Sequence, residues 1–88
     1  MTDIFAGLPR YFEGADDSTP TGCTLLVTKV LDLVTTYVLR DGEVIGRVEQ
    51  SNGQQDGYVG SGLKGGVFVG SGHFSVLAEK IADRAKGE

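Results

Sequence analysis

The chain lacks tryptophan, has a single cysteine and a single histidine, and contains no hydrophobic run near the roughly 20 residues of a membrane-spanning helix. One cysteine cannot form an internal disulfide, which fits a reducing compartment. The first residues carry no basic stretch followed by a hydrophobic one, so they do not have the pattern of a signal peptide. These absences predict a soluble, cytoplasmic protein with no membrane partner.

Clustered positive charge is absent as well. Eight lysines and arginines stand against twelve aspartates and glutamates, and the formal charge is −4. Nucleic-acid binders neutralise phosphates with clustered lysine and arginine, so this balance disfavours a nucleic acid as the partner. An anionic membrane surface is disfavoured for the same reason.

Few residues could carry catalysis or bind a metal. Cys23 and His73 are the only cysteine and histidine, whereas an activated nucleophile needs a base and a group that orients the base. A structural zinc site needs four such ligands, and the adjacent Asp16 and Asp17 lack the spacing of a calcium loop. We therefore expect no catalytic residue, no metal and no cofactor, and hence a protein that is not an enzyme.

The 88 residues suffice for one small domain. Residues 1–22 are interrupted by glycines and prolines and predict an extended N-terminal arm, in which apolar residues could form one or two helical turns. Residues 23–88 predict a single α+β domain. The arm either packs on this domain and caps its core, or docks on a partner as a linear peptide.

β-Branched residues dominate residues 23–50 and favour strands. Asp41-Gly42 stands between two such runs, and Asp-Gly supplies the positive φ angles of a two-residue type I′ hairpin turn. The register that follows places Tyr37 opposite Gly46. Side chains alternate between the faces of a strand, so the hairpin divides into a core face and a second face. The predicted core face holds Leu33, Thr35, Tyr37, Leu39, Val44, Gly46 and Val48.

The second face of this hairpin combines an apolar centre with a charged rim, a pattern found at protein interaction surfaces. A strand face covered by the N-terminal arm would have the same composition, so both interpretations stay open. The residues that we expect to bind a protein partner are Val38, Arg40, Glu43, Ile45 and Arg47.

An internal repeat follows the polar residues 51–57, which predict an exposed loop. The five residues that begin at Tyr58 recur ten positions later from Phe68, as an aromatic residue followed by Val-Gly-Ser-Gly. Two copies are too few for a solenoid. They predict two short strands around a glycine-rich turn, each with its aromatic ring in or near the core.

Residues 75–86 carry apolar side chains at helical spacing and predict an amphipathic helix on the sheet, with Ser75 as N-cap. The glycine-rich turn before this helix could bind one phosphate or carboxylate through free backbone N–H groups, although ordinary turn geometry is favoured. This weak anion site consists of Gly70, Ser71, Gly72, His73 and Ser75. The expected fold is α+β: an antiparallel sheet of about four strands packed by one C-terminal helix.

The hairpin from Tyr37 to Val48, followed by Phe74-Ser75 and a helix, is similar to small proteins of actinobacteria and their phages. No activity is assigned to that group. The layout also resembles the arm-type DNA-binding domain of phage integrases, which lays a three-stranded sheet in a DNA groove. That resemblance implies a DNA-binding sheet, but after Arg47 the sheet region offers only Lys64 as a cation.

These observations predict a small non-enzymatic protein-binding or regulatory protein, phage-encoded and acting on a host protein. One alternative is a sheet-type DNA-binding module. Another is a self-assembling virion or assembly subunit, a homo-oligomer in which the hairpin edge pairs with a copy of itself.

Overall fold

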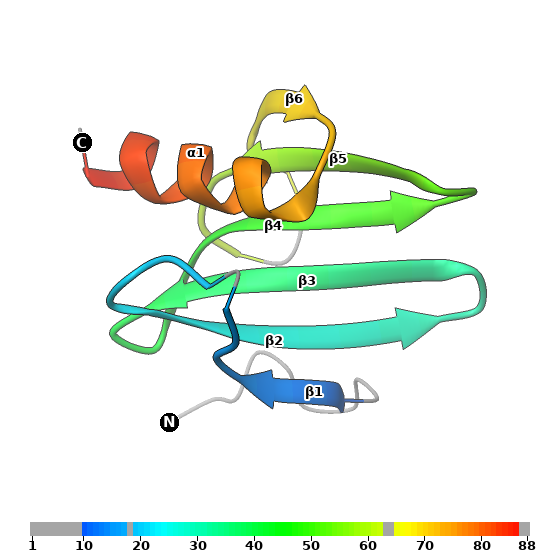
Figure 1. The fold of residues 1–88 in the computed structure, drawn as a ribbon, viewed down its shortest axis with the longest axis horizontal. Coiled ribbons are helices and arrows are strands. Elements are labelled where there is room, and N and C mark those ends of the chain that lie inside the picture. Colours follow the sequence, from blue (N-terminus) through cyan, green and yellow to red (C-terminus); the bar gives the residue numbers. More distant parts are fainter. Residues whose placement is uncertain (1–9, 18, 63–64, 87–88) are drawn as a thin grey trace.

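A computed structural model defines the fold and describes residues 10–17, 19–62 and 65–86 (Figure 1). Six strands form one antiparallel sheet, and each strand lies beside its neighbours in the chain, in the order β1-β2-β3-β4-β5-β6. The elements are β1 (Arg10–Gly14), β2 (Cys23–Val30), β3 (Leu33–Arg40), β4 (Glu43–Ser51), β5 (Gln54–Val59), β6 (Val67–Ser71) and α1 (Phe74–Lys86). The predicted antiparallel sheet with one C-terminal helix is confirmed, but the sheet has six strands rather than about four.

One additional strand comes from the predicted N-terminal arm. Arg10–Gly14 forms β1 and pairs antiparallel with β2, so this part of the arm forms a strand rather than helical turns. The remainder of the predicted turns, within residues 1–9, lies outside the described residues. β1 extends the sheet at its edge, and its Phe12 lies opposite Val27 of β2.

Residues 51–57, predicted to be an exposed polar loop, instead contain the tight turn between β4 and β5 and the first residues of β5. β4 continues to Ser51 and β5 begins at Gln54. Between them Asn52 and Gly53 have φ angles of 53° and 80°, the positive values that a type I′ turn requires. Asn-Gly is a strong hairpin signal, and the polar composition of the segment obscured it.

The predicted turn at Asp41-Gly42 is confirmed. The two residues have φ angles of 54° and 80°, and Arg40 lies opposite Glu43 as expected. The turn therefore fixes the pairing of the residues that flank it directly.

Further from this turn the predicted register is wrong. A β-bulge shifts the pairing, so that Val38 lies opposite Gly46 rather than Ile45. Tyr37 lies opposite Arg47, not opposite Gly46. Because side chains alternate, a one-residue shift moves every later side chain of the bulged strand to the other face.

The bulge separates the apolar residues into two clusters on opposite faces of the sheet. Val48 lies in the cluster beneath the helix, whereas Tyr37, Leu39 and Val44 belong to the other cluster, so the single predicted core face is wrong. Val38, predicted on the second face, is fully buried beneath the helix. The helix-side cluster contains Cys23, Leu25, Val38, Val48, Leu77, Ile81 and Ala82. The opposite cluster contains Leu26, Tyr37, Leu39 and Val44.

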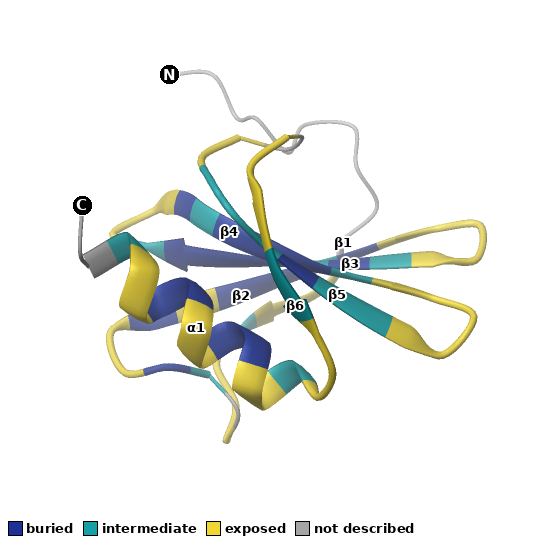
Figure 2. Ribbon diagram, turned by 90° about the horizontal axis from the view of Figure 1, so that it is seen from above, coloured by how far each residue is buried: buried dark blue, intermediate teal, exposed yellow. Residues whose placement is uncertain are grey.

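Helix α1 packs mainly on β4, β5 and β6 (Figures 1 and 2). Through the helix-side cluster and through Arg40 the helix also reaches β2 and β3, so its cover ends within these two strands. The N–H of Leu77 donates to the carbonyl of His73 at 3.1 Å, so His73 rather than Ser75 is at the N-cap position. The helix lies very close to the sheet at Gly46, where a Cβ would stand 2.5 Å from Ile81 Cγ2. The uncovered half of this face is where a binding site can form.

Candidate functional site

A groove of about 360 Å³ opens on the helix side of the sheet, beside the first turn of α1. We call it the helix-side groove. Its lining comes from β1 to β5, from α1 and from the segment between β1 and β2. The lining residues are Tyr11, Phe12, Asp16, Leu25, Val27, Thr36, Gln50, Gln55 and Phe74.

The floor of the groove is part of one row of residues that crosses the whole sheet. Successive strand pairs place Phe12 opposite Val27, Val27 opposite Thr36, and Thr36 opposite Val48. The same row then continues through Gly57 and Gly70 on β5 and β6. A Cβ at Gly57 would lie 3.3 Å from Leu77, so α1 covers this glycine end of the row. The other end, from Phe12 to Thr36, is open.

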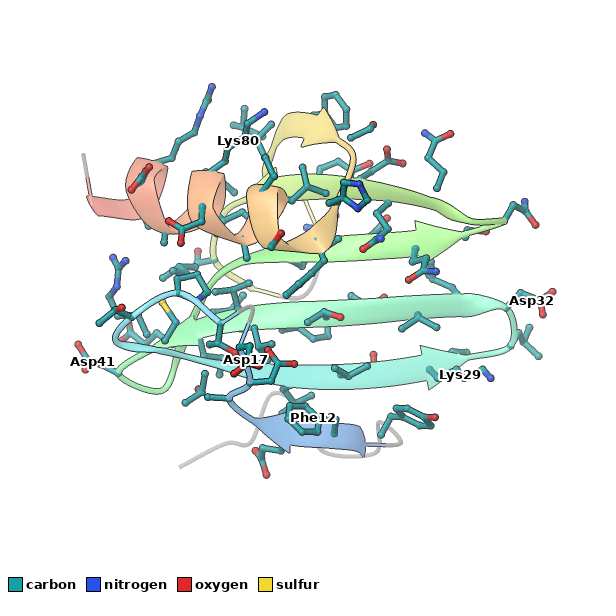
Figure 3. The ribbon with its side chains drawn as sticks, in the orientation of Figure 1. Phe12, Asp17, Lys29, Asp32, Asp41 and Lys80 are labelled. Atoms are coloured by element: carbon teal, nitrogen blue, oxygen red, sulfur yellow. The ribbon has the colours of Figure 1, made fainter. Side chains whose placement is uncertain are left out.

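Three aromatic residues line the groove, and they are Tyr11, Phe12 and Phe74. Phe12 is 40% exposed on β1, and its ring lies in front of the sheet, on the side that carries α1 (Figure 3). Phe74 is the first residue of α1 and is half-buried. The groove residues escaped prediction from sequence because they are distant along the chain and only the strand register brings them together.

The rim of the groove is acidic. Asp16 lines it directly, and its main-chain N–H donates to Thr19 Oγ1 at 2.7 Å, which orders the turn. A neighbouring hollow between this turn and α1 is lined by three acidic residues, Asp17, Glu79 and Asp83, and by one basic residue, Lys80, so acidic residues are in excess there. Asp17 lies on the helix side of the sheet (Figure 3). We call these four acidic residues the acidic rim. Its field favours a cationic group on whatever binds here.

The five residues predicted to bind a protein do not share one surface. Val38 is fully buried, and Ile45 packs against the helix-side cluster. Arg40 donates a hydrogen bond of 3.2 Å to a main-chain carbonyl of α1. Arg47 lies on the opposite face, and Glu43 is exposed at the Asp41-Gly42 turn. The bulge and the helix therefore distribute these residues among the core, a helix contact, a buried site on the opposite face and an exposed turn.

Arg47 is the centre of a buried polar cluster on the face away from α1. Its side chain is 10% exposed, and its Nε donates to Glu49 Oε2 at 2.8 Å. Its Nη1 donates to the carbonyl of Gly65, and its guanidinium carbon lies 4.5 Å from the centre of the Tyr58 ring. Arg47 thus fastens the glycine-rich connection between β5 and β6 to the sheet.

The aromatic residues of the repeat meet across two neighbouring strands, as the predicted pair of strands around a glycine-rich turn requires. Tyr58 of β5 lies opposite Phe68 of β6, and their rings make an edge-to-face contact with centroids 5.6 Å apart. Phe68 remains 54% exposed. Its ring is therefore at the border of the core rather than within it.

Two donors of the predicted anion site are already used within the chain. The N–H of Gly72 donates to the carbonyl of Gln55 at 3.1 Å, and the Ser71 hydroxyl donates to Asp56 Oδ1. The carboxylate beside Ser71 also repels an anion. His73 is exposed at the N-cap position, but no described contact turns this helix terminus into an anion site.

Replacing Asp56 with asparagine should make stability less dependent on pH in the acid range. The hydrogen bond from Ser71, and then that from Gln54, lower the pKa of Asp56. A lowered pKa in the folded state stabilises the protein above about pH 4 and ceases to do so as Asp56 is protonated below it. Because Asp56 lies at the surface and is only partly buried, we expect a small effect: a flatter dependence of the unfolding midpoint between about pH 5 and pH 2.

The same pH series on Asp17→Asn provides the control, because Asp17 is exposed and takes no part in the hydrogen bonds that Ser71 and Gln54 donate to Asp56. Equal slopes for wild type and Asp56→Asn would contradict the role given to the Ser71 hydrogen bond.

Within residues 10–17, 19–62 and 65–86, no three histidine, cysteine, aspartate or glutamate side chains are grouped to hold a metal ion. In the same part of the chain, no helix has the length and apolar character needed to span a bilayer. Comparison with protein-family models, with curated proteins and with solved structures found no match to this chain. A functional assignment therefore depends on the chemistry of the helix-side groove and its rim.

Proposed function

We propose that this protein is a small, non-enzymatic binding protein that holds a segment of a partner protein in the helix-side groove. The observation that supports this proposal is the row of residues that crosses the sheet. Its glycine end is covered by α1, whereas Phe12, Val27 and Thr36 at its other end form an open floor. A packed face that is left half open, with polar side chains around it, has the layout of an interaction site.

The lining defines the partner segment that would fit. Leu25 and Val27 favour an apolar side chain, and the amides of Gln50 and Gln55 can hydrogen-bond to a peptide main chain. The acidic rim favours a lysine or arginine beside that apolar residue. We therefore propose a segment that is both apolar and basic. A groove of this size gives a weak, transient contact rather than a permanent one.

Selection of displayed random peptides on the wild-type protein, with counter-selection on Thr36→Lys, tests this proposal. Recovered peptides should combine apolar residues with lysine or arginine. Thr36→Lys places an ammonium group in the floor, so it should weaken the binding of these peptides at least about tenfold. Phe12→Ser, which removes one wall, should also weaken binding, as measured by calorimetry on synthetic peptides.

Thr24→Lys is the matched control. Thr24 is exposed on β2, and alternation along the strand turns it away from α1, on the face opposite Leu25. The same chemical change should therefore leave peptide binding intact. Peptides that bind Thr36→Lys as well as wild type, or that share no basic and apolar pattern, would overturn the proposal.

The two alternative functions have less support. A DNA-binding sheet needs basic side chains that can contact phosphates. Arg40 and Arg47 are hydrogen-bonded within the chain, and Lys64 lies outside the described residues. The β3–β4 hairpin has β2 and β5 on either side, so it offers no free edge for self-pairing. Phage origin, a host target and a cytoplasmic location stay predictions from sequence.

A further inference from the structure

The turn between β4 and β5 holds Asn52, the single asparagine of the chain, directly before Gly53. The side-chain amide of an asparagine can react with the main-chain nitrogen of the next residue. A glycine in that next position favours the reaction, because it has no Cβ to obstruct the approach. Asparagine is accordingly one of the thermolabile residue types.

Nothing in the described chain shields this pair. Every residue from Gln50 to Gln54 is exposed, and a Cβ at Gly53 would have no neighbour within 4 Å. No described hydrogen bond involves the Asn52 side chain or the Gly53 N–H. The turn also extends beyond the end of α1, so the helix does not cover it (Figures 1 and 2). The amide carbon and the nitrogen that would attack it are therefore both accessible.

The folded turn controls how often these two atoms meet. Asn52 and Gly53 are held at φ angles of 53° and 80°, and we expect the main chain to open before the nitrogen reaches the amide carbon. Opening a turn at the end of a hairpin breaks only the pairing next to it, between Ser51 and Gln54. Fraying of this kind requires little free energy. The turn should therefore slow the reaction without preventing it.

We propose that Asn52 is a site of spontaneous deamidation in the folded protein. The nitrogen of Gly53 attacks Cγ of Asn52, so that a nitrogen–carbon bond forms and the Cγ–Nδ2 bond breaks. The proton of the Gly53 N–H leaves with Nδ2 as ammonia, and a succinimide ring remains. Water then opens the ring. Attack of water at Cγ gives aspartate, whereas attack at the main-chain carbonyl carbon gives isoaspartate, in which the main chain runs through the former side chain.

The two products differ in how they fit the turn. The Asp41-Gly42 turn already has an aspartate before a glycine, with φ angles of 54° and 80°, so the aspartate product fits this conformation. Isoaspartate lengthens the main chain by one methylene group, and a tight two-residue turn has a fixed length. The pairs that follow the turn, Ser51 with Gln54 and Gln50 with Gln55, should then lose their register.

This change extends to the helix-side groove, because Gln50 and Gln55 both line it. Their amides are the groups that we expect to hydrogen-bond to the main chain of a partner segment. The isoaspartate form should therefore bind the selected peptides about threefold more weakly or worse. This consequence rests on the proposed function, whereas the deamidation itself does not.

Incubation of the folded chain at mildly alkaline pH, followed by intact-mass measurement and peptide mapping, tests the proposal. Alkaline pH favours the deprotonated nitrogen that attacks. The mass should rise by the difference between an amide and an acid, and mapping should locate aspartate and isoaspartate at position 52. The rate should lie within about a hundredfold of that of a synthetic peptide of residues 50–56, which has no folded turn.

Two variants provide the controls. Asn52→Gly removes the reactive amide and accepts the positive φ, so its mass should stay constant under the same conditions. Asn52→Asp carries the new charge without the longer main chain. It should bind the selected peptides as well as the unmodified wild type, whereas the isoaspartate form, purified by chromatography, should bind them more weakly.

A folded protein that converts more than about a hundredfold more slowly than the peptide would overturn the proposal. So would a mass increase that persists in Asn52→Gly, which would assign the reaction to a glutamine. An isoaspartate form that binds the selected peptides like the unmodified protein would overturn the link to the groove. Failure to select any peptide would instead overturn the proposed function, and the mass measurement does not depend on that result.

Discussion

Replacing Gly46 with alanine is expected to lower the free energy of unfolding by about 3 kcal/mol, because the site has no room for a methyl group. A Cβ there would lie 2.5 Å from Ile81 Cγ2 and 2.5 Å from the carbonyl oxygen of Tyr58. Ile81 is fully buried in the helix-side cluster. The carbonyl belongs to β5, which is hydrogen-bonded to β4, so neither neighbour can move without displacing the helix or the strand.

Gly57→Ala is the matched control for this prediction. Both glycines lie beneath α1, but the nearest neighbours of a Cβ at Gly57 are side-chain atoms, Val69 Cγ2 at 3.1 Å and Leu77 Cδ2 at 3.3 Å. These can yield by a few tenths of an ångström, so Gly57→Ala should cost less than half as much. Urea unfolding of both variants measures the difference. Equal stability of Gly46→Ala and wild type would contradict the close approach of α1 to β4.

Local signals in the sequence predicted the elements that depend on neighbouring residues. The Asp41-Gly42 turn and the C-terminal helix follow from residue types at fixed spacing. Asn52-Gly53 is the same kind of turn signal, and on its own it predicts the β4–β5 hairpin. The apolar and aromatic residues of β1 gave no comparable signal, because an edge strand next to a proline- and glycine-rich segment is stabilised by its partner strand rather than by its own pattern.

The β-bulge between β3 and β4 could not be predicted from the sequence. Val44, Ile45 and Gly46 read as a regular strand, and nothing in their order marks Ile45 as the extra residue. Gly46 itself is a partial signal, since glycine within a strand often marks a bulge or a close approach. The register depends on the packing of α1, a contact between residues far apart in the chain. The helix-side groove depends on the same contact, because it exists where the helix cover ends.

Arg47 shows how this register changes a functional prediction. The sequence placed Arg47 on an interaction surface, where its loss would weaken partner binding without unfolding the protein. In the structure its side chain is 10% exposed and is hydrogen-bonded to Glu49 and Gly65. Arg47→Met should therefore lower the free energy of unfolding by about 2–3 kcal/mol, because it removes buried hydrogen bonds to a charged donor and the stacking on Tyr58.

Arg47→Lys separates the charge of this residue from its geometry. A lysine keeps the positive charge but has no planar fork with which to reach Glu49 and Gly65 while stacking on Tyr58, so it should restore less than half of the lost stability. Hydrogen exchange at the amides of Gly65 and Gly66 should be faster in both variants, because Arg47 fastens this segment to the sheet.

Arg84→Met is the control, since Arg84 is exposed on α1 and its replacement should change stability by less than about 0.5 kcal/mol. Peptide binding in the helix-side groove, on the opposite face, should survive Arg47→Lys under conditions in which the protein is folded. A variant that keeps its stability but loses peptide binding would return Arg47 to the interaction surface that the sequence first suggested.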